Sequence, residues 1–147
     1  MSVSGLGSEA KCGKLHASDL VVPYLSGGVA PKTLTNANDG ETIADPKGLY
    51  LVDANGGNTS ISFGDGSKSG DIAEVLYVRS GGNTFDLGIT VHIGGAKTAS
   101  FGTVSGGYLK CVWVSGISGV GNGWYVLARS ASTDATATSV SNLPALA

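Results

Sequence analysis

The chain has 147 residues, a formal net charge of −2 at pH 7, and a charged fraction of only 14%. Its nine basic residues are scattered, which argues against nucleic-acid binding, and no apolar run reaches the roughly eighteen residues of a transmembrane helix. The N-terminus lacks a charged region followed by an apolar one, so a secretory signal is not expected. We therefore expect one domain, made in a cytoplasm, that binds neither nucleic acid nor membrane.

Residues 1–33 are expected to form an extended, irregular arm. Ser18-Asp19 could open a short helix, but Pro23 and Gly27-Gly28 would end it almost at once. The arm still carries an apolar group, and exposed apolar groups usually mark interaction surfaces. We expect contacts with a partner protein or a neighbouring subunit from Leu15, Leu20, Val21, Val22, Tyr24 and Leu25. Docking on the chain's own domain and simple disorder are the alternatives.

Residues 34–130 are expected to form a β-domain of short strands. Turns rich in glycine, asparagine and aspartate separate the apolar runs at intervals of about ten residues. Asp45-Pro46-Lys47-Gly48 is a strong turn signal, and Asn55-Gly56-Gly57-Asn58 predicts a tight hairpin connection. The expected strands cover residues 33–35, 41–43, 48–54, 59–63, 72–80, 84–93, 99–104, 108–115 and 124–129.

The strand at residues 84–93 shows the clearest alternation. Its apolar residues fall on one side and its polar residues on the other, as in a strand with one buried side. The apolar positions are Phe85, Leu87, Ile89, Val91 and Ile93. We expect the runs 72–79 and 108–114 to pair with this strand in an antiparallel sheet. The sequence thus predicts an all-β fold, either a β-sandwich, a jelly roll or a small barrel, of about eight short antiparallel strands.

Residues 131–147 are expected to form a flexible tail. Residues 131–139 contain no large apolar side chain, and such segments are usually mobile or extended. Only Leu143 and Leu146 could anchor the tail. The predicted organisation is therefore an arm (1–33), a β-domain (34–130) and a tail (131–147).

No arrangement of residues in the sequence predicts catalysis. Serines are plentiful, but none lies in a Gly-x-Ser-x-Gly turn that opens a helix, and no glycine-rich segment has the lysine of a phosphate loop. Carboxylates such as Asp53 and Asp86 are better explained as turn or solvent-facing residues than as the catalytic pair of a glycosidase. We therefore expect no enzyme activity and no cofactor.

Two places in the sequence have some features of a metal site, and metal binding is not expected at either. The loop at residues 65–71 has alternating oxygen-bearing side chains, but it has a lysine in the middle and fewer carboxylates than calcium loops have. Cys12 and His16 lie four residues apart on the arm, without the second pair of ligands that structural zinc needs. Cys12 and Cys111 are expected to be free thiols, and a disulfide between them is the alternative.

Two groups of ring side chains have both a structural and a functional interpretation. His92, on the polar side of its strand, is expected to be exposed or simply hydrogen-bonded, and a place at a subunit contact is the alternative. Trp113, Trp124 and Tyr125 would form a sugar-binding platform if they faced outward. Packing in the core is the favoured interpretation, because both tryptophans fit the apolar side of their strands.

The end of the β-domain resembles the small β-domains of tailed-bacteriophage virion proteins. The resemblance lies in the run Gly-Gly-Tyr-Leu-Lys-Cys-Val-Trp-Val at residues 106–114, the glycine-rich loop after it, and Gly-Trp-Tyr-Val-Leu at residues 123–127. Residues 48–52 and 71–79 fit the same pattern, so the resemblance covers about residues 40–130. It implies a structural role in a virus particle, as a head decoration (cement) protein, a head fibre or a tail-fibre module, commonly as a homotrimer.

Among these roles, the layout of the chain favours a capsid decoration protein. A non-periodic arm precedes a compact β-domain, and the sequence has neither the heptads nor the collagen-like repeats of a long fibre. We expect the arm to contact the major capsid protein, the β-domain to form a homotrimer, and the protein to bridge coat subunits on the capsid surface. A receptor- or carbohydrate-binding module of a phage fibre or tail is the alternative.

Overall fold

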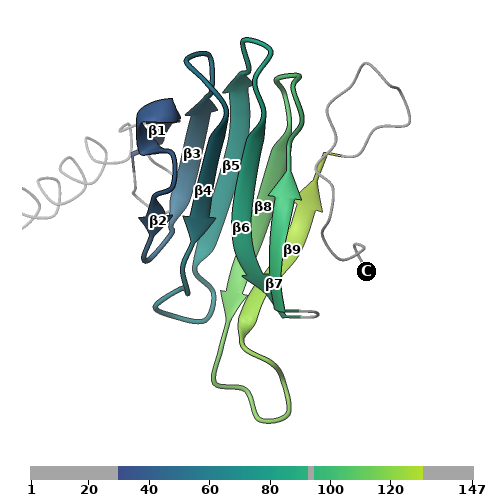
Figure 1. Cartoon of the computed structure of the whole chain (residues 1–147). Coiled ribbons are helices and arrows are strands. Elements are labelled where there is room, and N and C mark those ends of the chain that lie inside the picture. Colours follow the sequence, from purple (N-terminus) through teal and green to yellow (C-terminus); the bar gives the residue numbers. More distant parts are fainter. Residues whose placement is uncertain (1–29, 93–94, 131–147) are drawn as a thin grey trace, which may run out of the picture. The chain divides into compact units, whose positions relative to one another are not determined.

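The computed structural model describes residues 30–92 and 95–130, and Figure 1 shows them as an all-β domain. The described residues form nine strands, one 3₁₀ turn and no α-helix, which confirms the predicted fold class. The elements are β1 (Lys32–Thr35), the 3₁₀ turn (Asn36–Asn38), β2 (Thr42–Ile43), β3 (Gly48–Asp53), β4 (Thr59–Phe63), β5 (Ile72–Arg79), β6 (Phe85–Val91), β7 (Gly95–Ser100), β8 (Tyr108–Val114) and β9 (Gly123–Arg129). The predicted arm contacts at residues 15–25 and the predicted tail lie outside the described residues.

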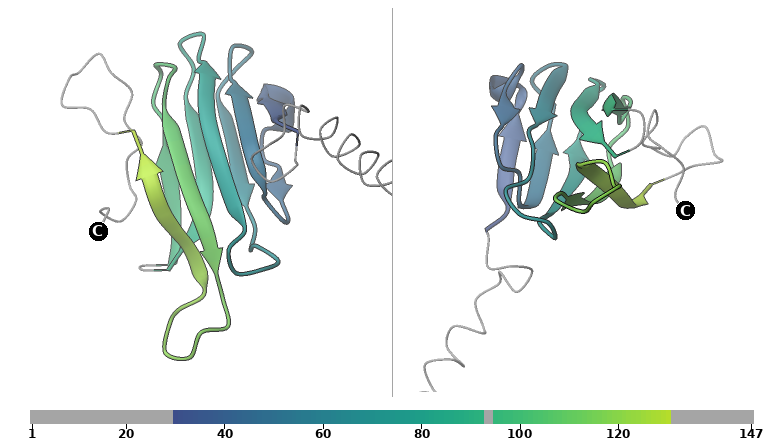
Figure 2. Two further views of the ribbon diagram at one scale, coloured as in Figure 1. Left: turned by 180° about the vertical axis from the view of Figure 1, so that it is seen from behind. Right: turned by 90° about the horizontal axis from the view of Figure 1, so that it is seen from below.

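The chain winds between two layers of strands. In the sheet order β1-β3-β5-β8-β9-β6-β4-β2, the odd-numbered strands β1, β3 and β5 lie at one end and the even-numbered strands β6, β4 and β2 at the other, and β7 pairs with β6. Each connection from β1 to β6 therefore leads from one layer to the other. β9 joins the layers, since it pairs with both β8 and β6. Figure 1 has β4, β6 and β7 in front, and Figure 2 (left) turns β3, β5, β8 and β9 to the viewer.

Most neighbours within the layers run parallel, in contrast to the antiparallel sheet expected from the sequence. β3 runs parallel to β1 and β5, and β4 runs parallel to β2 and β6. The strand with the clearest alternation, β6, pairs with β4, β7 and β9, not with β5 or β8, which pair antiparallel with each other. The predicted neighbours of β6 were therefore wrong. Alternation decides which side of a strand is buried, but it does not decide which strand lies beside it.

The turns after β3 and β5 carry the chain between layers, so the hairpin predicted at residues 55–58 is also wrong. The two turns lie next to each other and are joined by asparagine side chains. Asn58 Oδ1 accepts a hydrogen bond from the Thr84 N–H at 3.0 Å, and the Asn83 side-chain amide donates to the Ala54 carbonyl at 2.8 Å. Glycine and asparagine suit a crossing turn as well as a hairpin turn. The turn residues alone therefore did not reveal the winding.

The core lies between the two layers and contains aromatic side chains from both. Ring centroids lie 5.8 Å apart for Tyr77 and Phe85, and 4.8 Å apart for Phe85 and Phe101. A second group consists of Tyr50, Phe63, Trp113 and Trp124. Trp113 and Trp124 are 4% and 0% exposed, which confirms that they pack in the core. Burial of side chains of this size stabilises the fold by about 1.5–3 kcal/mol each.

Two strands differ locally from expectation. β7 begins at Gly95, four residues before the strand predicted at 99–104. The prediction missed residues 95–98 because they are exposed in this edge strand and show no apolar alternation. In β9 the register shifts opposite Lys110, so that Ala128 pairs with Lys110 while Val126 pairs with Cys111. Cross-strand partners point to the same side. Ala128 therefore points outward, whereas strict alternation along the strand would place it on the same side as Trp124 and Val126.

Candidate interaction surfaces

The outer side of β3, β5, β8 and β9 is largely apolar. Alternate residues of these strands fill the core, and the residues between them point outward in rows set by the strand register. One such row joins Leu51, Leu76 and Tyr108 across three strands. We call this side the apolar face. Glu74 and Lys110 also point outward on it, and its apolar members are Leu49, Leu51, Ile72, Leu76, Val78, Tyr108, Val112, Val114, Tyr125 and Leu127.

The apolar face is open in the part of the chain that the structure describes. Figure 2 (left) looks onto it, and no described strand lies over it. Ile72, Val78 and Leu127 leave 41%, 43% and 50% of their surface exposed. Monomeric proteins rarely expose contiguous apolar patches of more than a few hundred Å². This face is therefore a candidate interaction surface.

Charged side chains on the apolar face are bonded to one another. Glu74 accepts a hydrogen bond from the Tyr108 hydroxyl at 2.6 Å, and its other oxygen lies 3.8 Å from the Lys110 ammonium. Burial, together with Glu74, raises the pKa of Tyr108 to about 12. At one end of the face, Arg79 binds both oxygens of Asp53 and thereby lowers the pKa of the Asp53 carboxyl. These polar groups thus have partners within the layer, so that covering them would cost less than covering unpaired charges.

The outer side of β4, β6 and β7 has the opposite composition. We call it the polar face, which consists of Ser60, Ser62, Asp86, Gly88, Thr90, Ala96 and Thr98. Ser62, Gly88 and Thr98 form a row across the three strands, and a Cβ at Gly88 would lie only 2.7 Å from the Ser62 hydroxyl. An open groove of about 650 Å³ lies on this face. It is lined by Ser62, Phe63, Gly88, Ile89, Thr90, Ala96, Lys97 and Thr98.

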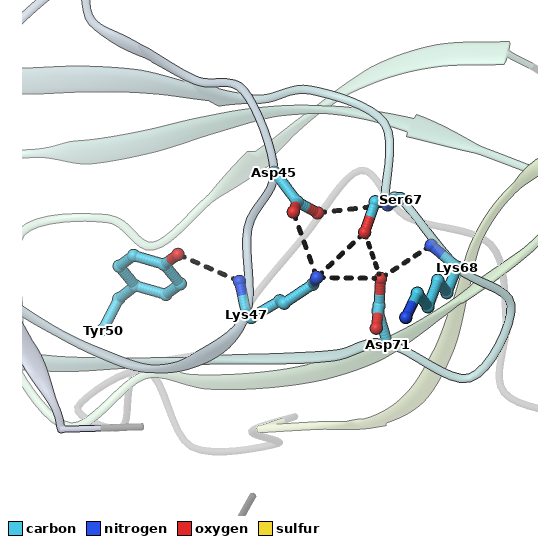
Figure 3. Close-up of polar contacts among 6 residues, drawn as sticks. All are labelled: Asp45, Lys47, Tyr50, Ser67, Lys68 and Asp71. Atoms are coloured by element: carbon cyan, nitrogen blue, oxygen red, sulfur yellow. Dashed lines mark hydrogen bonds and ion pairs between the residues drawn. The ribbon is translucent and has the colours of Figure 1, made fainter. Parts of the chain in front are cut away.

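A cluster of polar side chains joins the β2–β3 and β4–β5 connections, as Figure 3 shows. The Lys47 ammonium lies 3.0 Å from Asp45 Oδ2, 2.9 Å from Ser67 Oγ and 3.5 Å from Asp71 Oδ2. Asp71 Oδ2 also accepts hydrogen bonds from the Lys68 N–H at 2.8 Å and from the Ser67 hydroxyl at 3.2 Å. The hydrogen bond between Lys47 and Asp45 raises the pKa of the lysine and lowers that of the carboxyl. We call these side chains the Lys47 cluster.

The Lys47 cluster includes the loop at residues 65–71, where calcium was the alternative interpretation. Two oxygens of this loop, Ser67 Oγ and Asp71 Oδ2, contact the ammonium group of Lys47, which reaches them from a separate turn. Within residues 30–92 and 95–130, no group of three or more His, Cys, Asp or Glu side chains is placed to hold a metal ion. The same residues contain no helix that is long and apolar enough to cross a membrane.

Of the remaining residues singled out from the sequence, His92 and Tyr125 lie together. His92 is half-buried, its ring stacks on that of Tyr125 at 3.5 Å between centroids, and its Nδ1 lies 3.4 Å from the Trp124 carbonyl. Cys111 is a free thiol in the core, and burial raises its pKa to about 12. Cys12 and His16 lie outside the described residues. His92 is therefore a hydrogen-bonded side chain beside the apolar face.

Sequence reasoning missed the apolar face, although a signal for it was present. β3 reads Gly-Leu-Tyr-Leu-Val-Asp, and β8 reads Tyr-Leu-Lys-Cys-Val-Trp-Val, so both have large apolar residues on two sides. Strands of this kind need cover on both sides, and the core covers only one. The Lys47 cluster gave no comparable signal, because its members come from separate turns whose proximity depends on the winding of the chain.

Comparison with known proteins does not assign the chain to a family. No protein-family model matches it, and no curated protein matches it either.

Proposed function

We propose that this chain is a structural virion protein, namely a capsid decoration protein that binds the major capsid protein and stabilises the phage head by bridging coat subunits. The observation that carries this proposal is the open apolar face. A sheet that is apolar on both sides calls for a second protein surface, and the subunits of a particle supply one. The assignment to a virus particle depends on the resemblance of residues 106–127 to phage virion domains.

The proposal gives each part of the chain one role. Three copies pack their apolar faces together in a homotrimer, which buries Leu76 and its neighbours and leaves the polar face in water. A stable interface of this kind buries about 800 Å² of each partner or more. The arm, with its apolar residues at 15–25, contacts the coat protein. The protein therefore needs no catalytic site and no cofactor.

Two measurements on the purified full-length protein test this function. Light scattering should give the mass of three chains. Cosedimentation with empty, expanded capsids of the phage that encodes the chain should show saturable binding, whereas host cells should bind none of it. A monomeric mass contradicts the homotrimer. Binding to cells but not to capsids contradicts the decoration role.

Removal of the arm separates attachment from assembly. Deletion of residues 2–30 ends before β1, which begins at Lys32, so the β-domain should stay folded and trimeric. Attachment to capsids should be lost, because the apolar residues of the arm supply most of the contact. Circular dichroism, light scattering and cosedimentation measure the three properties. Unchanged capsid affinity of the truncated protein would show that the arm is only a tail.

A receptor- or carbohydrate-binding module of a phage fibre or tail is the second candidate function. The groove on the polar face favours it, because hydroxyl groups of Ser62, Thr90 and Thr98 line this groove. The aromatic platform considered for such a module does not support it, since Trp113 and Trp124 are buried in the core. Binding of host-cell polysaccharide that is lost when the groove is filled by Gly88→Val would favour this second function.

A further inference from the structure

The loop between β8 and β9 extends beyond the other loops at its end of the domain, as Figures 1 and 2 show. We call residues 115–122 the projecting loop. It contains no charged side chain, and two apolar side chains are exposed on it, Ile117 at 54% and Val120 at 40%. Exposed β-branched side chains at the end of a projection have no role in the fold's own core. They are therefore candidates for contact with a partner.

The projecting loop has a defined internal geometry. The Val120 N–H donates to the Ile117 carbonyl at 3.1 Å, which closes a four-residue turn with the two apolar residues at its ends. At the neck, the Gly116 N–H donates to Asn122 Oδ1 at 3.1 Å. Gly116 and Gly119 have φ values of 74° and 77°, a conformation that favours glycine. The tip thus presents Ile117 and Val120 as a pair.

The base of the projecting loop is braced by the β4–β5 connection. The Ser69 hydroxyl donates to the Ser115 carbonyl and accepts from the Ser115 N–H, both at 2.7 Å. The Gly70 N–H donates to the Trp113 carbonyl, and the Trp113 N–H donates to the Asp71 carbonyl, both at 2.8 Å. Four hydrogen bonds therefore join the connection to the strand and loop from which the tip projects.

The Lys47 cluster stabilises the connection that braces the loop. Lys47 contacts the Asp71 carboxylate and the Ser67 hydroxyl, which both belong to the β4–β5 connection. Gly66 lies so close to the Trp113 ring that a side chain at Gly66 would collide with it. A contact element that is ordered before binding loses less conformational entropy when it binds. The polar cluster thus supports the connection that braces the base of the loop.

We propose that the projecting loop is a second attachment element, which inserts Ile117 and Val120 into an uncharged, apolar recess of the coat protein. This inference depends on the proposed function, because it takes the coat protein as partner. The lack of charge over residues 115–122 fits an uncharged recess, since a charged lining would be left buried without a counter-charge. It does not fit an anionic membrane, for which basic side chains would be expected on the loop.

The test compares full-length proteins in cosedimentation with empty, expanded capsids. Ile117→Asp/Val120→Asp should bind at least about tenfold more weakly than the wild type, because two contact residues become charged. Val104→Asp is the matched control, since Val104 is a valine of similar exposure, at 46%, in the β7–β8 connection, and its capsid affinity should not change. Lys47→Met keeps the tip but loosens its support, so its affinity should fall about threefold. All variants should keep the wild-type mass and circular dichroism.

The outcomes separate this inference from the proposed function. If the wild type binds capsids and the tip variant binds equally well, the inference is overturned and the decoration role stands. If the wild type does not bind capsids, the decoration role fails, and the inference fails with it. A tip variant that no longer forms trimers makes the loop a subunit contact and overturns the inference. Wild-type binding to phosphatidylserine vesicles that the variant lacks overturns it in favour of a lipid surface.

Discussion

The apolar face and the polar face belong to the same domain and share one core, yet they differ in what they present outside. Between their core residues, β3, β5 and β8 carry mostly Leu, Ile, Val and Tyr, whereas β4, β6 and β7 carry Ser, Thr, Asp, Gly and Ala. A domain surrounded by water on both sides would need only the second composition. The comparison is the basis for our proposal that one layer stays solvated while a partner covers the other.

The two faces also differ in how their polar groups are satisfied. On the apolar face, Glu74 is bonded to both Tyr108 and Lys110 within the same layer. On the polar face, Ser60 and Thr90 are exposed, so water can satisfy their hydroxyl groups. A face that becomes buried has to satisfy its polar groups internally, because unsatisfied groups are costly away from water. The bonding pattern thus agrees with the composition.

The largest expected effect comes from a charge placed on the apolar face. Leu76→Asp puts a carboxylate in the middle row, between Leu51 and Tyr108, and burial of an unpaired charge at an interface is strongly unfavourable. The dissociation constant of the trimer should rise at least about a hundredfold. Thr90→Asp, at an exposed position of β6 on the polar face, should leave assembly unchanged. Light scattering over a range of concentrations measures both variants.

Circular dichroism has to accompany this measurement. Leu76 lies outside the core, so both variants should keep the strand signal of the wild type. A trimer that tolerates Leu76→Asp would show that the apolar face is not the subunit interface. A trimer that dissociates equally with Thr90→Asp would show that the two faces do not differ in the way proposed.

Local properties of the domain were predictable from the sequence because they depend on neighbouring residues. The alternation of β6 predicted correctly that Phe85, Leu87, Ile89 and Val91 are buried, and the fifth apolar position, Ile93, lies outside the described residues. The same argument placed Trp113 and Trp124 in the core. Both predictions follow from the period of two along a strand, which does not depend on the order of strands in the sheet.

The order of the strands could not be predicted, because the turns are ambiguous. The side chains of Asn58 and Asn83 each form a hydrogen bond to the other of the two turns after β3 and β5. No local sequence pattern distinguishes such a crossing turn from a hairpin turn. β7 was misplaced since an exposed edge strand has no apolar alternation. The apolar face could have been predicted from the two-sided strands β3 and β8. The Lys47 cluster could not, because its residues meet only once the winding is known.

A smaller effect is expected from the loss of the hydrogen bond between Tyr108 and Glu74 on the apolar face. Tyr108→Phe removes the hydrogen bond to Glu74 and should lower the free energy of unfolding by about 1 kcal/mol at pH 7. In the wild type, the pKa of Tyr108 is raised from its ordinary value near 10 to about 12. The folded state therefore keeps a proton that the unfolded state loses. This contribution to stability is complete below pH 10 and is lost as the pH rises towards 12.

Urea unfolding at pH 7 to 11 and equal protein concentration tests this prediction. Tyr108→Phe should lose stability less steeply above pH 10 than the wild type does. The Cys111 thiol, whose pKa is also raised to about 12, adds a slope of its own, but it is present in both proteins and cancels in the difference. Equal slopes for the two proteins would show that Tyr108 does not titrate as expected.

The smallest net effect is expected in the groove of the polar face, where a second substitution should offset the cost of an added side chain. The Cβ of Gly88→Val would lie 2.7 Å from Ser62 Oγ, so the hydroxyl must move, and unfolding should become easier by about 1 kcal/mol. Ser62→Ala removes the collision, and a β-branched residue suits a strand, so the double variant should regain the stability of the wild type or exceed it. Urea unfolding measures the recovery, and light scattering should show trimers throughout. A double variant as unstable as Gly88→Val alone would mean that the groove, not the hydroxyl, requires glycine at this position.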